Sequence, residues 1–423
     1  MNKTKDIVVT GFALFSLFFG AGDLILPPFL GFNSGTSWML VALGFAITAV
    51  MIPVLGLLAH AKLQGTMYDF GKNVSPLFSL IYCIIVYLIC VLLPAPRTAS
   101  VTHEMAIEPF FETSPFLTST IYFGLVFLFV INRSKIIDII GKFLTPLIII
   151  ILLIIISIGV FVSPESISAS RMAVPLVSGL LEGYQTYGAI GSIVVGGVVI
   201  VSLNIRGHLP QEEKQNFIKK SAFVAGIGLF VVYTGLIIIG AFYSSVFAED
   251  LTRTKLLSSL STTTLGSMGT IFLSVLVALA CFTTAVGIIT GTADYFKSLF
   301  NNSQLAYTLT AIIACVSGVL IGQFNVGFII DIAVPALLLI YPITIVLILL
   351  NVIPERFASP FVFKIVVLIT FLFSIPDFLM YWLSDEKILD LIEIIPLSNY
   401  SLGWLIPATL TFIVTNVISS KKA

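Results

Sequence analysis

Residues 18–31, FFGAGDLILPPFLG, place helix-breaking and charged residues inside a long apolar segment. Gly20, Gly22, Asp23 and the pair Pro27–Pro28 fall within nine positions. In a helix interior, glycine and proline cost roughly 1 and 3 kcal/mol per residue, and a carboxylate at a bilayer centre costs roughly 2.5–3.5 kcal/mol. Helix packing can use glycine but needs no carboxylate. The stretch therefore favours a helix that is interrupted for binding, with Gly20, Ala21 and Gly22 offering backbone groups and Asp23 an acid.

A second interruption is expected in LLEGYQTYGAIGSIVVGG, residues 180–197. We interpret Gly183, Tyr184, Gly188 and Gly191 as candidates for a second binding break, and the last two glycines, at 196 and 197, as packing residues. Freed N–H groups at a helix N-terminus attract a carboxylate, and freed carbonyls suit Na⁺ or an ammonium group. The aromatic residues Tyr184, Tyr187, Tyr341 and Trp38 are more often packing or interfacial aromatics than ligands.

Two threonines interrupt another apolar run, LACFTTAVG. On a helix, the carbonyl of Ala280 and the hydroxyls of Thr283 and Thr284 share one face. Three neutral oxygens suit a hard cation. Threonine that bonds back to its own helix explains the same spacing, and spacing alone favours that simpler reading.

The composition places the chain in a membrane. It has 423 residues, of which 58% are hydrophobic and 10% charged, whereas soluble domains have about 25% charged residues. The formal net charge is zero, and no basic patch suggests a nucleic-acid partner. The four cysteines lie in apolar segments without disulfide or zinc spacing. We find no catalytic constellation and no cofactor motif, which argues against an enzyme, and nothing implies a protein partner.

A membrane-spanning helix needs about 20 apolar residues, and twelve such segments are predicted. They are 7–32, 38–61, 76–101, 116–132, 142–163, 176–205, 218–246, 268–296, 305–323, 327–350, 361–381 and 399–419. With the N-terminus inside, 16 of the 21 lysines and arginines fall in the inner segments. This bias predicts that both termini are cytoplasmic. The first segment lacks a signal-peptide cleavage site and is expected to be retained.

The two broken spans, the first and the sixth, stand five spans apart and so cross the membrane in opposite directions. This is the signature of a five-plus-five inverted repeat with binding at the discontinuous helices. We expect an all-α integral membrane protein with a ten-helix core over 1–350. Its repeats would cover about 7–163 and 176–350, and two further helices would lie in 351–423.

Other charges in or near the spans are candidate gate residues. Arg97 follows Pro94 and Pro96 in span 3, and Asp331 lies near the outer end of span 10. An ionisable residue in a span is a functional candidate, and our hypothesis is an outer gate in which Arg97 pairs with Asp331 or Asp23. Snorkelling of Arg97 to lipid headgroups is an equal alternative. Glu182 is interpreted as interfacial.

Four strings together resemble one family: FFGAGDLILPP, PAPRTASVTHE, LEGYQTYGAIG and LACFTTAVG. They are similar to the branched-chain amino acid:cation symporters of bacteria, within the amino acid–polyamine–organocation superfamily, which has the fold of the bacterial leucine transporter. The resemblance covers nearly the whole chain. It implies that the broken helices hold the amino and carboxylate groups of the substrate. It also implies a sodium site of Thr283, Thr284 and the carbonyls of Ala280, Ser16 and Phe19.

The chain departs from that family at two positions. Asp23 stands where the family usually has asparagine, and Gly188 stands where it usually has aspartate. From the resemblance we predict sodium-coupled uptake of leucine, isoleucine and valine across a bacterial inner membrane, with Na⁺ as coupling ion and no cofactor. The alternative is a proton-coupled permease for another small or hydrophobic amino acid, with Asp23 as the proton site.

Overall fold

The computed structural model describes residues 3–132, 145–162, 166–206, 210–381, 392 and 394–420, and every regular element among them is helical. The first part of the chain forms α1 (Lys3–Phe18), α2 (Ala21–Ser34), α3 (Trp38–Ala46), α4 (Ile52–Leu63), α5 (Met67–Gly71), α6 (Pro76–Leu92), α7 (Pro94–Thr102), α8 (Pro115–Ile131) and α10 (Thr145–Phe161). The second part forms α11 (Pro175–Tyr184), α12 (Gly188–Arg206), α13 (Gln211–Phe242), α14 (Arg253–Leu265), α15 (Ser267–Leu299), α16 (Gln304–Ile321), α17 (Val326–Val352), α18 (Pro360–Leu379) and α20 (Leu405–Ser420). A π-helical turn, Ile47–Met51, joins α3 to α4, and another, His103–Ile107, follows α7.

Seven helical runs in the described residues are long and apolar enough to cross a membrane. They are Ala21–Leu63, Pro76–Ile107, Gln211–Phe242, Ser267–Leu299, Gln304–Ile321, Val326–Val352 and Pro360–Leu379. Three shorter apolar helices are Pro115–Ile131, Thr145–Phe161 and Leu405–Ser419. Each predicted span overlaps a helix, but the first and sixth are divided into shorter pieces by their breaks.

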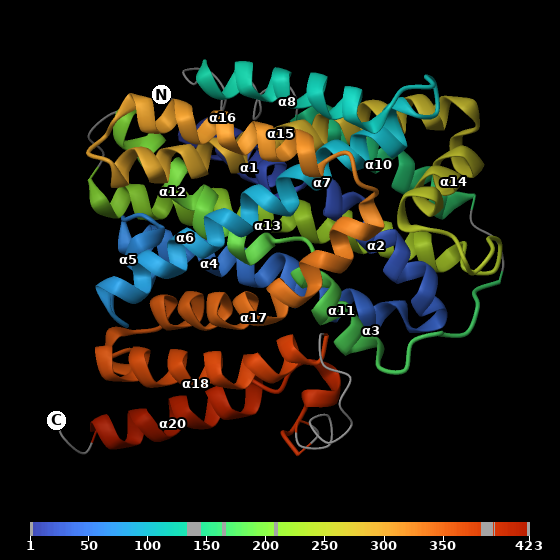
Figure 1. Ribbon diagram of the computed structural model, residues 1–423. Coiled ribbons are helices and arrows are strands. Elements are labelled where there is room, and N and C mark those ends of the chain that lie inside the picture. Colours follow the sequence, from blue (N-terminus) through green and yellow to red (C-terminus); the bar gives the residue numbers. More distant parts are fainter. Residues whose placement is uncertain are drawn as a thin grey trace.

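The broken helices lie in the middle of the helical bundle (Figure 1), with α8 along one side and α18 and α20 along the opposite side. In that view α1 leads to α2 from left to right, whereas α11 leads to α12 from right to left, so the two broken helices run in opposite directions. The start of α1 and the end of α20 lie at the same end of the bundle.

Each broken helix packs against a span from the other part of the chain. Both α1 and α2 contact α13, while α11 contacts α3 and α12 contacts α4. Glycines permit these close approaches. A Cβ added to Gly240 of α13 would lie 2.0 Å from the carbonyl oxygen of Pro28, and one added to Gly179 of α11 would lie 2.3 Å from that of Val41. Backbone therefore touches backbone at both contacts.

Large apolar side chains also cover the outside of the bundle. Leu77 on α6, Ile121 on α8 and Ile313 on α16 are each more than half exposed, at 67%, 57% and 64%. Apolar surface of this extent is expected where the surroundings are lipid. The four cysteines, by contrast, are free and buried.

Candidate functional site

The first interruption falls at Phe19 and Gly20, between α1 and α2. Gly20 is extended (φ −120°, ψ −159°) and caps α2. The Asp23 carboxylate reaches back, and its Oδ2 accepts a hydrogen bond from the Gly20 N–H at 2.8 Å. A carboxylate in the first helical turn also interacts favourably with the helix dipole. The glycine and the acid that the sequence singled out thus act together to end one helix and start the next.

The second interruption covers Gln185, Thr186 and Tyr187, between α11 and α12. Tyr187 has φ +58°, the left-handed region that side chains other than glycine rarely adopt. The new N-terminus of α12 is capped by side chains. The Gly188 N–H donates to Thr186 Oγ1 at 3.1 Å, and the Ala189 N–H donates to the hydroxyl of Tyr341 at 3.0 Å. Strained backbone that is held by such contacts is typical of functional sites.

Five oxygens gather where the first break meets α15. Thr283 Oγ1 lies 3.2 Å from the Ser16 carbonyl oxygen and 3.0 Å from the Ala280 carbonyl oxygen. Thr284 Oγ1 lies 3.3 Å from the Phe19 carbonyl oxygen. Thr283 does bond back to its own helix, as the simpler reading required, but it also reaches α1. All five are neutral, and neutral oxygens of this kind fit a monovalent hard cation.

Asp23 is buried, with 2% of its surface exposed. Its Oδ1 accepts a hydrogen bond of 2.5 Å from the hydroxyl of Tyr233 on α13. Both carboxylate oxygens therefore have a donor, one from the break itself and one from the helix that packs beside it. The carboxylate fixes the first turn of α2 against α13.

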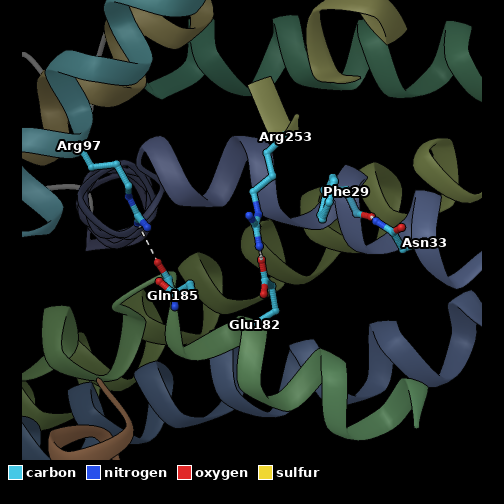
Figure 2. A network of polar contacts seen from close by, with 6 residues as sticks. All are labelled: Phe29, Asn33, Arg97, Glu182, Gln185 and Arg253. Carbon is cyan, nitrogen blue, oxygen red and sulfur yellow. Dashed lines mark hydrogen bonds and ion pairs between the residues drawn. The ribbon is translucent and has the colours of Figure 1, made fainter. Parts of the chain in front are cut away.

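Arg97 comes from α7 and points at the second break (Figure 2). Its Nη2 donates to the Gln185 carbonyl oxygen at 2.7 Å, and the guanidinium carbon lies 5.1 Å from the centre of the Tyr187 ring. The side chain is 3% exposed. It also touches the first break, because a Cβ added to Gly22 would lie 2.4 Å from Nη2.

A small cavity of about 30 Å³ lies between the two breaks. Its polar wall includes Asp23, Arg97, Thr98, Thr186 and Thr284. Its apolar wall includes Leu17, Phe18, Cys90, Pro94, Val194, Val195 and Ile288, from spans 1, 3, 6 and 8. A site with a few fixed polar groups and an apolar body suits a small amphiphilic molecule.

Comparison with known proteins identifies the family. The family model for branched-chain amino acid transport proteins matches residues 3–422. The chain belongs to this family. The branched-chain amino acid permease BraB of Bacillus subtilis is 33% identical over 99% of this chain and 97% of its own length. The family consists of transporters of branched-chain amino acids and not of enzymes, and the multi-span, apolar chain is a bacterial inner-membrane protein.

Solved structures of transporters share the fold. A Na⁺-coupled sialic acid symporter aligns with a TM-score of 0.61 at 13% identity, over 97% of this chain and 90% of its own. Mhp1, a transporter of the nucleobase-cation-symport-1 family, aligns with a TM-score of 0.62 at 14% identity, over 98% and 93%. At these identities the likeness concerns the fold alone.

The substrate residues predicted for this branched-chain amino acid transporter divide into two groups. Gly20, Ala21, Gly22, Gly188 and Gly191 line the cavity. Two others face neighbouring helices instead. A Cβ added to Gly183 would lie 1.9 Å from Thr48 Oγ1, and the Tyr184 ring stacks on Tyr341 with 4.3 Å between the ring centres. Gly183 thus faces the π-helical turn Ile47–Met51 and Tyr184 faces α17, so both support the break without lining the cavity.

The predicted outer gate is not assembled as expected. Within the described residues, no ion pair joins Arg97 to Asp331, and Asp331 is exposed on α17. Of the two residues, Arg97 lines the central cavity, whereas Asp331 does not. Instead, Glu182, interpreted from the sequence as interfacial, binds Arg253 of α14 with N–O distances of 3.0 and 3.2 Å.

Sequence reasoning missed several residues at the site. Tyr233 is a lone tyrosine in the apolar run of α13, and Tyr341 sits among apolar residues of α17, so both resemble ordinary packing aromatics. Their hydroxyls turn out to bond Asp23 and the N-terminus of α12. A single hydroxyl deep in an apolar span is the available signal, because it needs a partner there.

Proposed function

We propose that this transporter takes up leucine, isoleucine and valine together with sodium by alternating access. The observation that carries the proposal is the cluster of five neutral oxygens from Ser16, Phe19, Ala280, Thr283 and Thr284, which joins the first break to α15. A sodium ion held there would fix the broken helix against α15. Ligands that stabilise one shape of a transporter shift its population toward that shape.

The amino acid is proposed to bind in the cavity between the breaks. Gly20, Ala21, Gly22, Gly188 and Gly191 would present backbone groups to its polar end, and the apolar wall formed by spans 3, 6 and 8 would take its aliphatic side chain. The present cavity of about 30 Å³ is too small for a whole amino acid. Binding therefore requires the half-helices to move apart, which discontinuous helices permit.

We further propose twelve spans, with the ten-helix inverted repeat, its placement in the amino acid–polyamine–organocation superfamily, and both termini in the cytoplasm. The exchange of partners supports the repeat, since broken helix α1–α2 packs on α13 and broken helix α11–α12 packs on α3–α4. A two-fold relation between repeats demands such reciprocal packing. The common end of the bundle for the start of α1 and the end of α20 supports an even number of spans.

The second candidate is proton coupling, which Asp23 favours. It is a carboxylate at the break, lining the same cavity, and it is buried. A buried acid can change its charge rather than bear the desolvation cost. Asp23 would then carry the coupling proton, with Tyr233 and the Gly20 N–H as its partners.

Uptake of radiolabelled leucine into proteoliposomes, with sodium and proton gradients imposed separately, tests the two candidates. We expect a sodium gradient alone to drive accumulation. Thr283→Ala should raise the sodium concentration for half-maximal uptake by about tenfold, the equivalent of about 1.4 kcal/mol. Accumulation driven by the proton gradient alone would favour the second candidate, and accumulation under neither gradient would refute symport.

Thr292→Ala is the matched control. Thr292 is buried in the same helix, and among the described residues its Oγ1 donates to one acceptor, the Ile288 carbonyl oxygen of that helix, at 2.8 Å. It does not line the cavity. Its removal should leave the sodium dependence unchanged. An equal sodium shift in both variants would show that any loss of a threonine from α15 has this effect, and would remove the support from the oxygen cluster.

A further inference from the structure

Arg97 has more donors than its protein partners use. Its guanidinium carries five N–H groups and cannot be deprotonated. One goes to the Gln185 carbonyl oxygen. In the described residues, the buried Nε and Nη1 have no hydrogen-bond partner. Arg97 is therefore a fixed cation with spare donors, and it lines the cavity between the two breaks.

No carboxylate neutralises this cation within ion-pair distance in the described chain, where the ion pairs are Arg171–Glu249 and Arg253–Glu182. Asp23 lines the same cavity and attracts Arg97 electrostatically from beyond ion-pair distance, but its two oxygens accept from Tyr233 and from the Gly20 N–H. A buried charge that has no ion-pair partner is costly, and a ligand that supplies the opposite charge recovers much of that cost. Arginine is also the residue best suited to a carboxylate, because its N–H groups form a planar fork.

The position of Arg97 suits the carboxylate of an amino acid. The guanidinium lies against Gly22 in the first turn of α2 and against Gln185 and Tyr187, which precede α12. The N-termini of both half-helices carry partial positive charge. Arg97 adds a full charge to that region. Glycine at position 22 is required for this contact, since a Cβ there would lie 2.4 Å from Nη2.

We propose that Arg97 binds the α-carboxylate of the substrate directly and is the residue that selects amino acids over the corresponding amides and amines. The inference rests on the proposed function, because it places the substrate between the two breaks. It replaces the pairing of Arg97 with Asp331 as a gate. The Gln185 bond holds the guanidinium in place, and the remaining N–H groups bind the ligand.

Competition against radiolabelled leucine in detergent-solubilised protein tests the proposal, with leucinamide and 3-methylbutylamine as the probes. Leucinamide keeps the side chain and the amino group but has no negative charge. Wild-type protein should bind leucine about 100-fold more tightly than leucinamide, as expected when one member of a buried charge pair is removed. Arg97→Gln should weaken leucine by a similar factor and reduce the preference to about threefold or less. Arg97→Lys, which keeps the charge without the fork, should give an intermediate preference.

Arg171→Gln is the control, since Arg171 pairs with Glu249 outside the cavity. It should keep the full preference for leucine. A merely structural role of Arg97 would weaken leucine and leucinamide in parallel and leave their ratio unchanged, and this result would overturn the proposal. Equal affinity of wild-type protein for leucine and leucinamide would also overturn it, whether or not the variants fold.

The same preparation separates this inference from the sodium proposal. Leucine binding that is independent of sodium, but keeps the Arg97-dependent preference, would refute sodium coupling and leave the carboxylate contact standing. Sodium-dependent leucine binding whose preference over leucinamide does not depend on Arg97 would support sodium coupling and overturn the carboxylate contact. Absence of leucine binding to the wild type would overturn both.

Discussion

Substitutions at Asp23 and Tyr233 should separate a structural carboxylate from a coupling carboxylate. Asp23 accepts two hydrogen bonds, at 2.5 Å from the Tyr233 hydroxyl and at 2.8 Å from the Gly20 N–H. Asparagine can keep both. Its oxygen can accept from the Gly20 N–H, and its amide can donate to the Tyr233 oxygen once that hydroxyl turns its hydrogen away. Alanine keeps neither.

The expected loss of stability depends on which hydrogen-bonding groups each substitution leaves without a partner. A hydrogen bond to a charged group contributes about 1.5–3 kcal/mol, and a neutral one about 0.5–1.5 kcal/mol. Asp23→Asn changes two charged bonds to neutral ones but removes a buried charge, so its net cost should be about 1 kcal/mol. Tyr233→Phe removes one charged bond, about 1.5–3 kcal/mol. Asp23→Ala leaves two buried donors unpaired, at about 1–3 kcal/mol each. The free energy of unfolding should fall least for Asp23→Asn, more for Tyr233→Phe and most for Asp23→Ala.

The assays are thermal unfolding in detergent and leucine uptake under separate sodium and proton gradients. If sodium is the coupling ion, Asp23→Asn should keep sodium-driven accumulation with a rate within about tenfold of wild type, the equivalent of about 1.4 kcal/mol. Asp23→Asn that is as destabilised as Asp23→Ala would refute the hydrogen-bond reasoning. Asp23→Asn that folds normally but loses accumulation would refute a purely structural role and make the carboxylate part of the coupling.

Two further predictions concern contacts away from the cavity. Glu182→Arg and Arg253→Glu should each slow leucine uptake severalfold, because this partly exposed ion pair contributes about 1 kcal/mol to holding α14 against α11. The double exchange should restore part of the uptake rate. A double variant that is no faster than either single variant would contradict the pairing. Gly240→Ala should lower the thermal unfolding temperature, since its Cβ would lie 2.0 Å from the Pro28 carbonyl oxygen and overpacking costs about 1–3 kcal/mol. Gly124→Ala in α8, with no atom within 4 Å of the added Cβ, is its control and should be neutral or slightly stabilising; equal loss in both would show that the close approach is not the cause.

Structural features that depend on residues close together in the chain could be predicted from the sequence. The breaks could be predicted because glycine, proline and an acid in an apolar run are strong local signals, and the observed interruptions at 19–20 and 185–187 lie inside the predicted stretches. Which residue faces which depends on lateral packing of distant helices. Tyr233 is 210 positions from Asp23, and no local pattern in α13 marks it as the partner. The same limitation produced the pairing of Arg97 with Asp331, since topology gives depth in the membrane but not the direction a helix face points.

Apart from the Asp23 carboxylate, which also lines the cavity, the polar groups at the breaks are sorted by charge. The N-termini of α2 and α12 and the guanidinium of Arg97 meet the cavity, while the carbonyls of Ser16 and Phe19, at the C-terminal end of α1, face α15. Helix N-termini carry partial positive charge and C-termini partial negative charge. A sodium ion would satisfy the negative end, and a substrate carboxylate would satisfy the positive one. Both ligands would therefore stabilise the same interrupted geometry of span 1. Since coupling between two ligands is reciprocal, sodium should tighten leucine binding by the same factor by which leucine tightens sodium binding.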